Sequence, residues 1–145
     1  MSLSAKIQAK IDEVIKNFYH DNPYVQHIGL DLHHIEEGTV TLKLTVEKRH
    51  TNFYEIAHGG LVMSMLDTAM GAASLSVNKK IVTQSLTTNF IRGPKVGTEI
   101  FATGKVIHNG RRTVVSEAVL REGEDGRILA TASGSFFVLG LLLED

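Results

Sequence analysis

The chain has 145 residues, 43% of them hydrophobic, which predicts one globular domain with a sizeable core. Its net charge of −1 argues against a general nucleic-acid binder, and the absence of cysteine excludes disulfides, thiol catalysis and cysteine-ligated zinc. The longest apolar run, FFVLGLLL, is too short to span a bilayer, and residues 1–20 contain no signal-peptide core. We therefore expect a cytoplasmic protein with one domain over residues 1–145.

An amphipathic helix is predicted at the start of the chain. Hydrophobic side chains recur there at helical spacing, at Ile7, Ile11, Val14, Ile15 and Phe18. This spacing predicts a helix over about residues 4–19, and Asn22-Pro23 ends it. Residues 1–24 are thus expected to form a helical extension that covers either a pocket or only an edge of the sheet.

Strands are predicted on both sides of a long central helix. TVTLKLTV, at 39–46, alternates polar and apolar residues, and Glu37-Gly38 predicts a hairpin with the preceding GLDLHHI. Further strands are predicted at about 81–92, 98–108, 111–122 and 128–138, with turns at Asn109-Gly110 and Asp125-Gly126. An apolar helix needs cover on both sides, so the predicted fold is α+β, with an antiparallel five- to six-stranded sheet wrapped around it.

The central helix, AHGGLVMSMLDTAMGAA, begins at a histidine and two glycines and carries one carboxylate, Asp67. A buried, unpaired carboxylate is costly unless a neighbour uses or neutralises it. The first N–H groups of a helix lack partners within it, and glycine lets a ligand approach them closely, which predicts a site for negative charge. Asp67 lies nine residues beyond His58, on the opposite side of the helix and roughly 13 Å further along. The two residues of one chain therefore cannot act on the same carbonyl group.

Two antiparallel copies of this helix, related by a twofold axis, would bring the helix start of one chain to Asp67 of the other. Small residues that would allow the close approach are Ala69, Gly71, Ala72 and Ala73, and Ser64 and Thr68 are expected to provide hydrogen bonds there. A homodimer is therefore a requirement of any mechanism that uses both His58 and Asp67.

The strand after the helix has an unusual polar pattern. Strict alternation places Thr83, Ser85, Thr87 and Asn89 on one face and Val82, Leu86 and Phe90 on the other. A wholly polar face beside a buried helix is typical of the lining of a wet pocket.

Asn52, the HGG run at 58–60 and Asp67 occur together in an order of elements that resembles the hotdog-fold acyl-CoA thioesterases of the phenylacetate-degradation type, over about residues 25–138. The resemblance implies hydrolysis of an acyl- or aryl-CoA to the free acid and CoA. It implies that the Gly59 amide stabilises the oxyanion, that Asn52 holds the carbonyl group or the water, and that His58 orients the loop near the sulfur. Ser85 matches a hydroxyl that positions the water or the acid. Asp67 then acts as general base or as nucleophile, and neither route needs a metal or other cofactor.

The same resemblance implies a coenzyme A site near the turn HNGRRTVV and near IRGPK, because arginine forks suit phosphate oxygens. The residues carried over are Thr87 in the substrate channel and Arg92, Gly110, Arg111, Arg112 and Thr113 at the nucleotide. Hotdog dimers commonly pair, so a homotetramer is expected, with neither a nucleic acid nor a membrane as partner.

Other interpretations stay open at this point. Asp67 can cap a loop or pair with a cation, Ser85 can be an ordinary strand serine, and two arginines at a turn can simply be solvated. A non-catalytic acyl-CoA-binding hotdog protein would lose the acid, and a hydratase or dehydratase would carry a different acid–base motif. The six histidines besides His58 look incidental. The acyl group is also open, since the candidates fit either an apolar pocket or ordinary core: Phe53, Tyr54, Leu61, Val62 and Met65.

Overall fold

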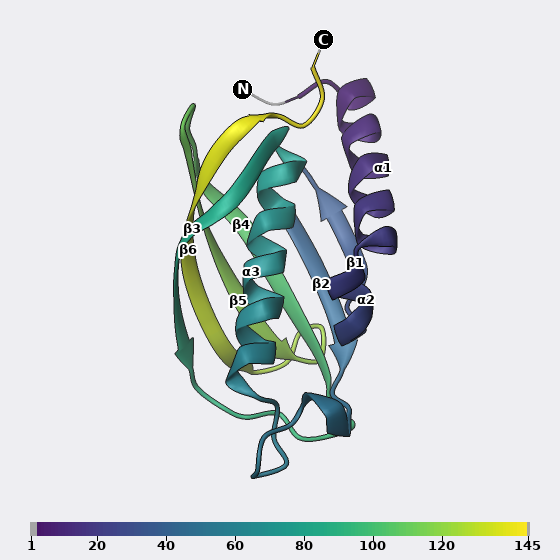
Figure 1. The fold of residues 1–145 in the computed structure, drawn as a ribbon, viewed down its shortest axis with the longest axis vertical. Coiled ribbons are helices and arrows are strands. Elements are labelled where there is room, and N and C mark those ends of the chain that lie inside the picture. The colour runs from purple at the N-terminus through teal and green to yellow at the C-terminus, as the bar shows by residue number, and fades with distance from the viewer. Residues whose placement is uncertain (1–2, 145) are drawn as a thin grey trace.

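The computed structural model describes residues 3–144. Its elements are α1 (Ala5–Asp21), α2 (Pro23–Ile28), β1 (Asp31–Glu36), β2 (Thr39–Thr45), the 3-10 helix η1 (Lys48–His50), α3 (Gly59–Ser76), β3 (Lys79–Phe90), β4 (Glu99–Asn109), β5 (Thr113–Glu122) and β6 (Ile128–Leu141). In Figure 1, α3 runs along the curved sheet, with β3 and β6 on one side of it and β1, α1 and α2 on the other.

One antiparallel sheet contains all six strands, in the order β1-β2-β4-β5-β6-β3. The predicted order of elements is therefore confirmed: a helix, a hairpin, a long helix and four more strands. The turn between β4 and β5 is closed by the Gly110 N–H, which donates to the Thr113 carbonyl. Since β3 pairs only with β6 in this sheet, it is an edge strand.

The N-terminal segment is helical beyond the predicted extension. Ser4 caps α1 by accepting from the Ile7 N–H, and α1 ends at Asp21 with Asn22 as its C-cap, as Asn22-Pro23 predicts. The Asn22 side chain then accepts from the Tyr24 and Val25 N–H groups and so caps α2, which the sequence did not predict. Proline suits the first turn of a helix because its missing N–H would have no partner there.

The small residues of α3 pack on the chain's own sheet. Ala69, Ala72 and Ala73 are fully buried in the core. A Cβ added to Gly104 of β4 would lie 2.3 Å from the Ala69 carbonyl oxygen, so the helix backbone and β4 are in close contact. The expectation that these three alanines face a second helix is therefore wrong, because the sheet already covers them.

One side of α3 is left uncovered by the sheet, contrary to the expected cover on both sides. The residues that are not buried follow one another at helical spacing and form the α3 stripe: Gly59, Gly60, Met63, Ser64, Asp67, Thr68, Gly71 and Leu75. The N-terminal helices reach part of this stripe, because the Tyr24 hydroxyl bonds to Ser64 Oγ at 2.6 Å and the Tyr19 hydroxyl donates to the Thr68 carbonyl at 3.4 Å. Asp67 is thus only half-buried, which removes much of the burial cost expected from the sequence.

Candidate active site

The start of α3 leaves one amide free. His58 is the N-cap, and its Nδ1 accepts from the Gly60 N–H at 2.8 Å. The Leu61 and Val62 N–H groups both donate to the His58 carbonyl. The Gly59 N–H has no acceptor within residues 3–144. This amide, at the positive end of an 18-residue helix, is therefore available to a ligand oxygen.

A cavity of about 330 Å³ lies at this amide. Its lining comes from the loop before α3, the first turn of α3 and the end of β3 with the following segment: Asn52, Ile56, Ala57, Gly59, Val62, Phe90, Ile91, Arg92, Gly93 and Pro94. Asn52 Oδ1 accepts from the Tyr54 N–H at 2.9 Å and from the Ile56 N–H at 3.4 Å. Its oxygen is thus used by the loop, whereas its amide Nδ2 donates to no described residue. The structure therefore brings Asn52, Gly59 and Arg92 together.

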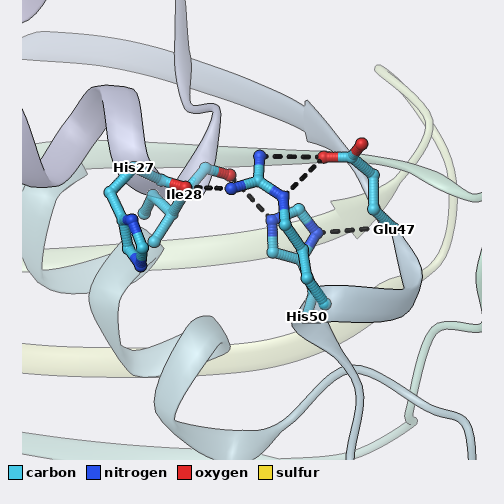
Figure 2. A network of polar contacts seen from close by, with 5 residues as sticks. His27, Ile28, Glu47 and His50 are labelled. Atoms are coloured by element: carbon cyan, nitrogen blue, oxygen red, sulfur yellow. Dashed lines mark hydrogen bonds and ion pairs between the residues drawn. The ribbon is translucent and has the colours of Figure 1, made fainter.

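The loop that carries Asn52 and His58 is fixed by a buried histidine, His50 (Figure 2). Its Nδ1 accepts from the Glu47 N–H at 2.9 Å, so its Nε2 carries the proton and donates to the Ile28 carbonyl at 2.8 Å. Arg49 pairs with the Glu47 carboxylate at 2.9 Å and also donates to the His27 carbonyl. The His58 N–H in turn donates to the His50 carbonyl at 2.8 Å. His50 is therefore a structural support of the site, and treating it as incidental was wrong.

Asp67 lies outside the cavity, on the α3 stripe. Its Oδ1 accepts from the Thr83 hydroxyl of β3 at 2.7 Å. It is eight residues beyond Gly59, roughly 12 Å along the helix axis. Within one chain, the Gly59 amide and the Asp67 carboxylate are therefore separate, as their spacing in the sequence predicts.

Thr83 was expected to share a face with Ser85, and this is wrong. The pairing of β3 with β6 shifts between Thr83 and Ser85, which leaves Gln84 as a bulge residue. Thr83 reaches Asp67 before the bulge, and Leu86 packs on the core after it. Strand alternation then directs Ser85 and Thr87 away from α3, and both are exposed. The sequence contains no turn signal or glycine at Gln84 that would reveal the bulge.

The expected coenzyme A residues lie at two ends of the sheet. Arg92 lines the cavity, whereas Gly110, Arg111, Arg112 and Thr113 belong to the β4–β5 turn. Thr113 of β5 pairs with Phe137 of β6, and Phe137 pairs with Val82 of β3. Val82 is ten residues before Arg92, so the turn and Arg92 are roughly 33 Å apart along the strand direction. Figure 1 shows this turn at the end of the sheet where α3 ends. One chain therefore does not bring Arg92 and the two turn arginines together.

The five residues expected to line an acyl pocket lie in different places. Leu61 and Met65 are buried in the core, and Val62 lines the cavity. Phe53 is fully exposed at 101% and Tyr54 is 81% exposed, both in the loop before α3. The exposed pair thus lines no apolar cavity beside the Gly59 amide.

Two further features are not found within residues 3–144. None of the helices described is long and apolar enough to cross a membrane. No three His, Asp or Glu side chains of these residues lie close enough together to hold a metal ion.

A long helix packed along one six-stranded antiparallel sheet is the arrangement of the hotdog fold. The family model described as the thioesterase superfamily matches residues 54–129, and the chain belongs to this family.

Relatives of known structure agree with this assignment. The chain is 28% identical over 126 residues to the acyl-coenzyme A thioesterase PaaI of Escherichia coli, covering 80% of this chain and 90% of that protein. The solved structure of E. coli PaaI matches with a TM-score of 0.86 at 25% identity, over 92% of this chain and 96% of that one. A Streptococcus mutans protein bound to acetyl CoA matches with a TM-score of 0.74 at 28% identity, over 77% and 90%.

Proposed function

We propose that the protein hydrolyses acyl-CoA thioesters in a site built from two copies of the chain. The family supports a thioester hydrolase, and the E. coli relative is named an acyl-coenzyme A thioesterase. The Streptococcus mutans relative binds acetyl CoA. The observation that carries the proposal is the free Gly59 amide at the start of α3, with a cavity in front of it.

The thioester carbonyl oxygen binds at the Gly59 N–H. Charge develops on this oxygen as water or a carboxylate attacks the carbonyl carbon, and a fixed amide at a helix start stabilises it. Asn52 Nδ2, which the loop leaves free, donates to the same carbonyl group or to the water. His58, whose Nδ1 is occupied by the Gly60 N–H, presents a protonated Nε2 on the sulfur side.

Asp67 of the second copy supplies the carboxylate. It takes a proton from the attacking water, whose oxygen bonds to the carbonyl carbon as the C–S bond breaks and the CoA thiolate leaves. Alternatively it attacks the carbonyl carbon directly, which expels the CoA thiolate and gives an anhydride that water then hydrolyses. Thr83 holds one carboxylate oxygen, which leaves the other for the reaction. Both routes run on side chains of the protein alone. Ser85 and Thr87 are directed away from α3, so we assign them no role beside Asp67.

The uncovered surfaces support a homodimer. The α3 stripe and the edge strand β3 lie side by side, since Gly59 faces Phe90, Asp67 bonds to Thr83 and Gly71 faces Ile81. Antiparallel pairing of two β3 edges about a twofold axis would place the Lys79 end of one strand beside the Phe90 end of the other. The helix start of one chain then approaches Asp67 of its partner.

The same pairing explains the separated arginines. It would carry the β4–β5 turn of one chain, with Gly110, Arg111, Arg112 and Thr113, toward Arg92 and the cavity of the other. We assign these residues to the phosphates of coenzyme A, because two exposed arginines at a turn suit phosphate oxygens.

The outer surface of the sheet supports a tetramer of two such dimers. Large hydrophobic side chains are about half exposed along β3, β4 and β6, at Val82, Ile107, Phe137, Leu139 and Leu141. An apolar patch of this kind is typical of a surface that another subunit covers.

Release of free thiol from a panel of acyl-CoA thioesters tests the proposed function. The wild type is expected to hydrolyse at least one thioester, and Asp67→Asn is expected to lower kcat by at least 100-fold with an unchanged fold by circular dichroism. Thiol release that survives in Asp67→Asn removes Asp67 from the mechanism. A wild type that binds acyl-CoA and releases no thiol favours the non-catalytic alternative.

A further inference from the structure

The end of α2 leaves two backbone carbonyls without a partner inside the helix, those of His27 and Ile28. Arg49 Nη1 donates to the His27 carbonyl, and His50 Nε2 donates to the Ile28 carbonyl at 2.8 Å (Figure 2). Both donors come from η1, the short segment just before the loop that carries Asn52. The carbonyl end of α2 is therefore capped by side chains of the site region.

The end of α2 is also tightly packed. Val25 and Ile28 are buried in the hydrophobic core. Gly29 ends the helix with φ +74°, and a Cβ added there would lie 2.9 Å from Arg49 Nη2. His50 is 5% exposed, so water has little access to its bond with the Ile28 carbonyl. Loss of that bond would leave a buried carbonyl without a partner, which favours a shift of η1 relative to α2.

The position of His50 sets the backbone of the loop that carries the candidate site. Its carbonyl accepts from the His58 N–H at 2.8 Å, and Gly59, whose amide is free, is the next residue. Asn52 is two residues beyond His50, and its N–H donates to the Ile56 carbonyl at 2.9 Å. A shift of His50 therefore moves the Asn52 side chain and the Gly59 N–H together.

We propose that His50 and Arg49 are positioning residues of the thioesterase reaction, and that their bonds to the end of α2 align the site. The proposal rests on the proposed function, because the groups that are aligned, Asn52 Nδ2 and the Gly59 N–H, are those that act there on the thioester carbonyl. Neither positioning residue touches the substrate. A displacement of about 1 Å in such groups lowers a rate by up to about 100-fold, so the N-terminal helices contribute to kcat.

Two substitutions of His50 separate its two hydrogen bonds. In His50→Gln the amide nitrogen takes the place of Nε2 and donates to the Ile28 carbonyl. In His50→Asn the side-chain oxygen takes the place of Nδ1 and accepts from the Glu47 N–H, but the side chain is too short to reach α2. The readout is kcat and KM for thiol release from whichever of acetyl-, octanoyl- and phenylacetyl-CoA the wild type hydrolyses fastest. We expect kcat of His50→Gln within about threefold of the wild type, and a fall on the order of tenfold in His50→Asn with KM within about threefold.

Gly29→Ala disturbs the same contact from the side of α2, because its Cβ would displace Arg49 Nη2. Gly123→Ala is the matched control, since Gly123 has the same φ of +74° and a Cβ there would meet nothing within 4 Å. Alanine is strained by this φ at both positions, but only at Gly29 does it meet η1. We therefore expect kcat to fall on the order of tenfold in Gly29→Ala and to stay within about twofold of the wild type in Gly123→Ala.

Amide hydrogen exchange over residues 50–62, measured by mass spectrometry, follows the loop without any substrate. Exchange is expected to be faster than in the wild type in His50→Asn and Gly29→Ala, and unchanged in His50→Gln and Gly123→Ala. Equal kcat in His50→Gln and His50→Asn, with an active wild type, overturns the role of α2 and leaves the proposed function intact. A wild type that hydrolyses none of the three thioesters overturns the proposed function, and with it the positioning role, even where exchange differs among the variants.

Discussion

The two glycine amides at the start of α3 have different roles. His58 takes the Gly60 N–H through its Nδ1, and the Gly59 N–H is left without an acceptor in the described part of the chain. A histidine N-cap thereby strengthens the helix start and, at the same time, selects which amide a ligand meets. The chemistry proposed for the site depends on this single N–H group.

Gly59→Pro removes that N–H group with little other change. Gly59 is the first residue of the helix, where proline is favoured, and His58 before it has the extended conformation that proline requires, with φ −60° and ψ 140°. We expect kcat to fall on the order of 100- to 1000-fold. Gly59→Ala keeps the N–H, and its Cβ would lie 3.5 Å from the Phe90 ring, so it is the control that keeps most of the activity. Equal activity of the two variants would show that the amide does not act on the substrate.

Thr83 is the residue that positions Asp67 in the structure. Thr83→Val keeps the shape of the side chain and removes the hydroxyl that donates to Asp67 Oδ1. Because a hydrogen bond to a charged group contributes more than a neutral one, kcat is expected to fall about tenfold with little change in KM. Thr83→Ser retains a hydroxyl and is expected to restore most of the rate. If valine and serine at this position give the same kcat, the bond has no part in catalysis.

At the scale of elements, the spacing of hydrophobic residues predicted the helices and strands that depend on such spacing. The α1 helix, the β1–β2 hairpin, the α3 helix and the order of the last four strands follow from spacing and turn residues, and all are confirmed. The bulge at Gln84 places the Thr83 hydroxyl, and not the Ser85 hydroxyl, beside Asp67. It depends on the pairing of β3 with β6 rather than on any local sequence pattern. The burial of Ala69, Ala72 and Ala73 depends in the same way on contacts distant in sequence. For the same reason, the sequence did not predict the bond from Thr83 to Asp67 or the supporting role of His50, because tertiary partners define both.

The N-terminal helices stabilise α3 through two tyrosines, and one of them makes stability depend on pH. Burial, and then the Asp67 charge, raise the pKa of Tyr19 above its usual value. The folded state therefore keeps the Tyr19 proton more firmly than the unfolded chain does. This contribution is complete below about pH 10, the pKa of an unfolded tyrosine, and is lost as the pH rises above it.

Urea unfolding between pH 8 and pH 11 measures this effect. The free energy of unfolding of the wild type is expected to fall with increasing pH above about pH 10. Tyr19→Phe carries no titrating group at this position and is expected to lose less stability over the same range. Parallel curves for the two proteins would contradict the burial of the Tyr19 hydroxyl beside Asp67.

At the scale of the whole molecule, one chain keeps the two halves of the proposed site apart. The Gly59 amide and Asp67 are roughly 12 Å apart along α3, and Arg92 and the β4–β5 turn are at opposite ends of β3. Helix geometry alone predicted the first separation from the sequence. The second required the strand register, because nothing in the turn HNGRRTVV indicates which end of the sheet it reaches. The proposed twofold axis beside β3 would remove both separations.

A mixture of two inactive variants tests this shared site most directly. Gly59→Pro and Asp67→Asn are unfolded together in equal amounts and refolded, and thiol release is compared with that of each variant refolded alone. Random pairing makes about half of the dimers hybrids, in which one of the two sites has both its amide and its carboxylate, so we expect about a quarter of the wild-type activity. Activity no higher than that of the separate variants, with hybrid dimers present by native mass spectrometry, would show that each chain completes its own site.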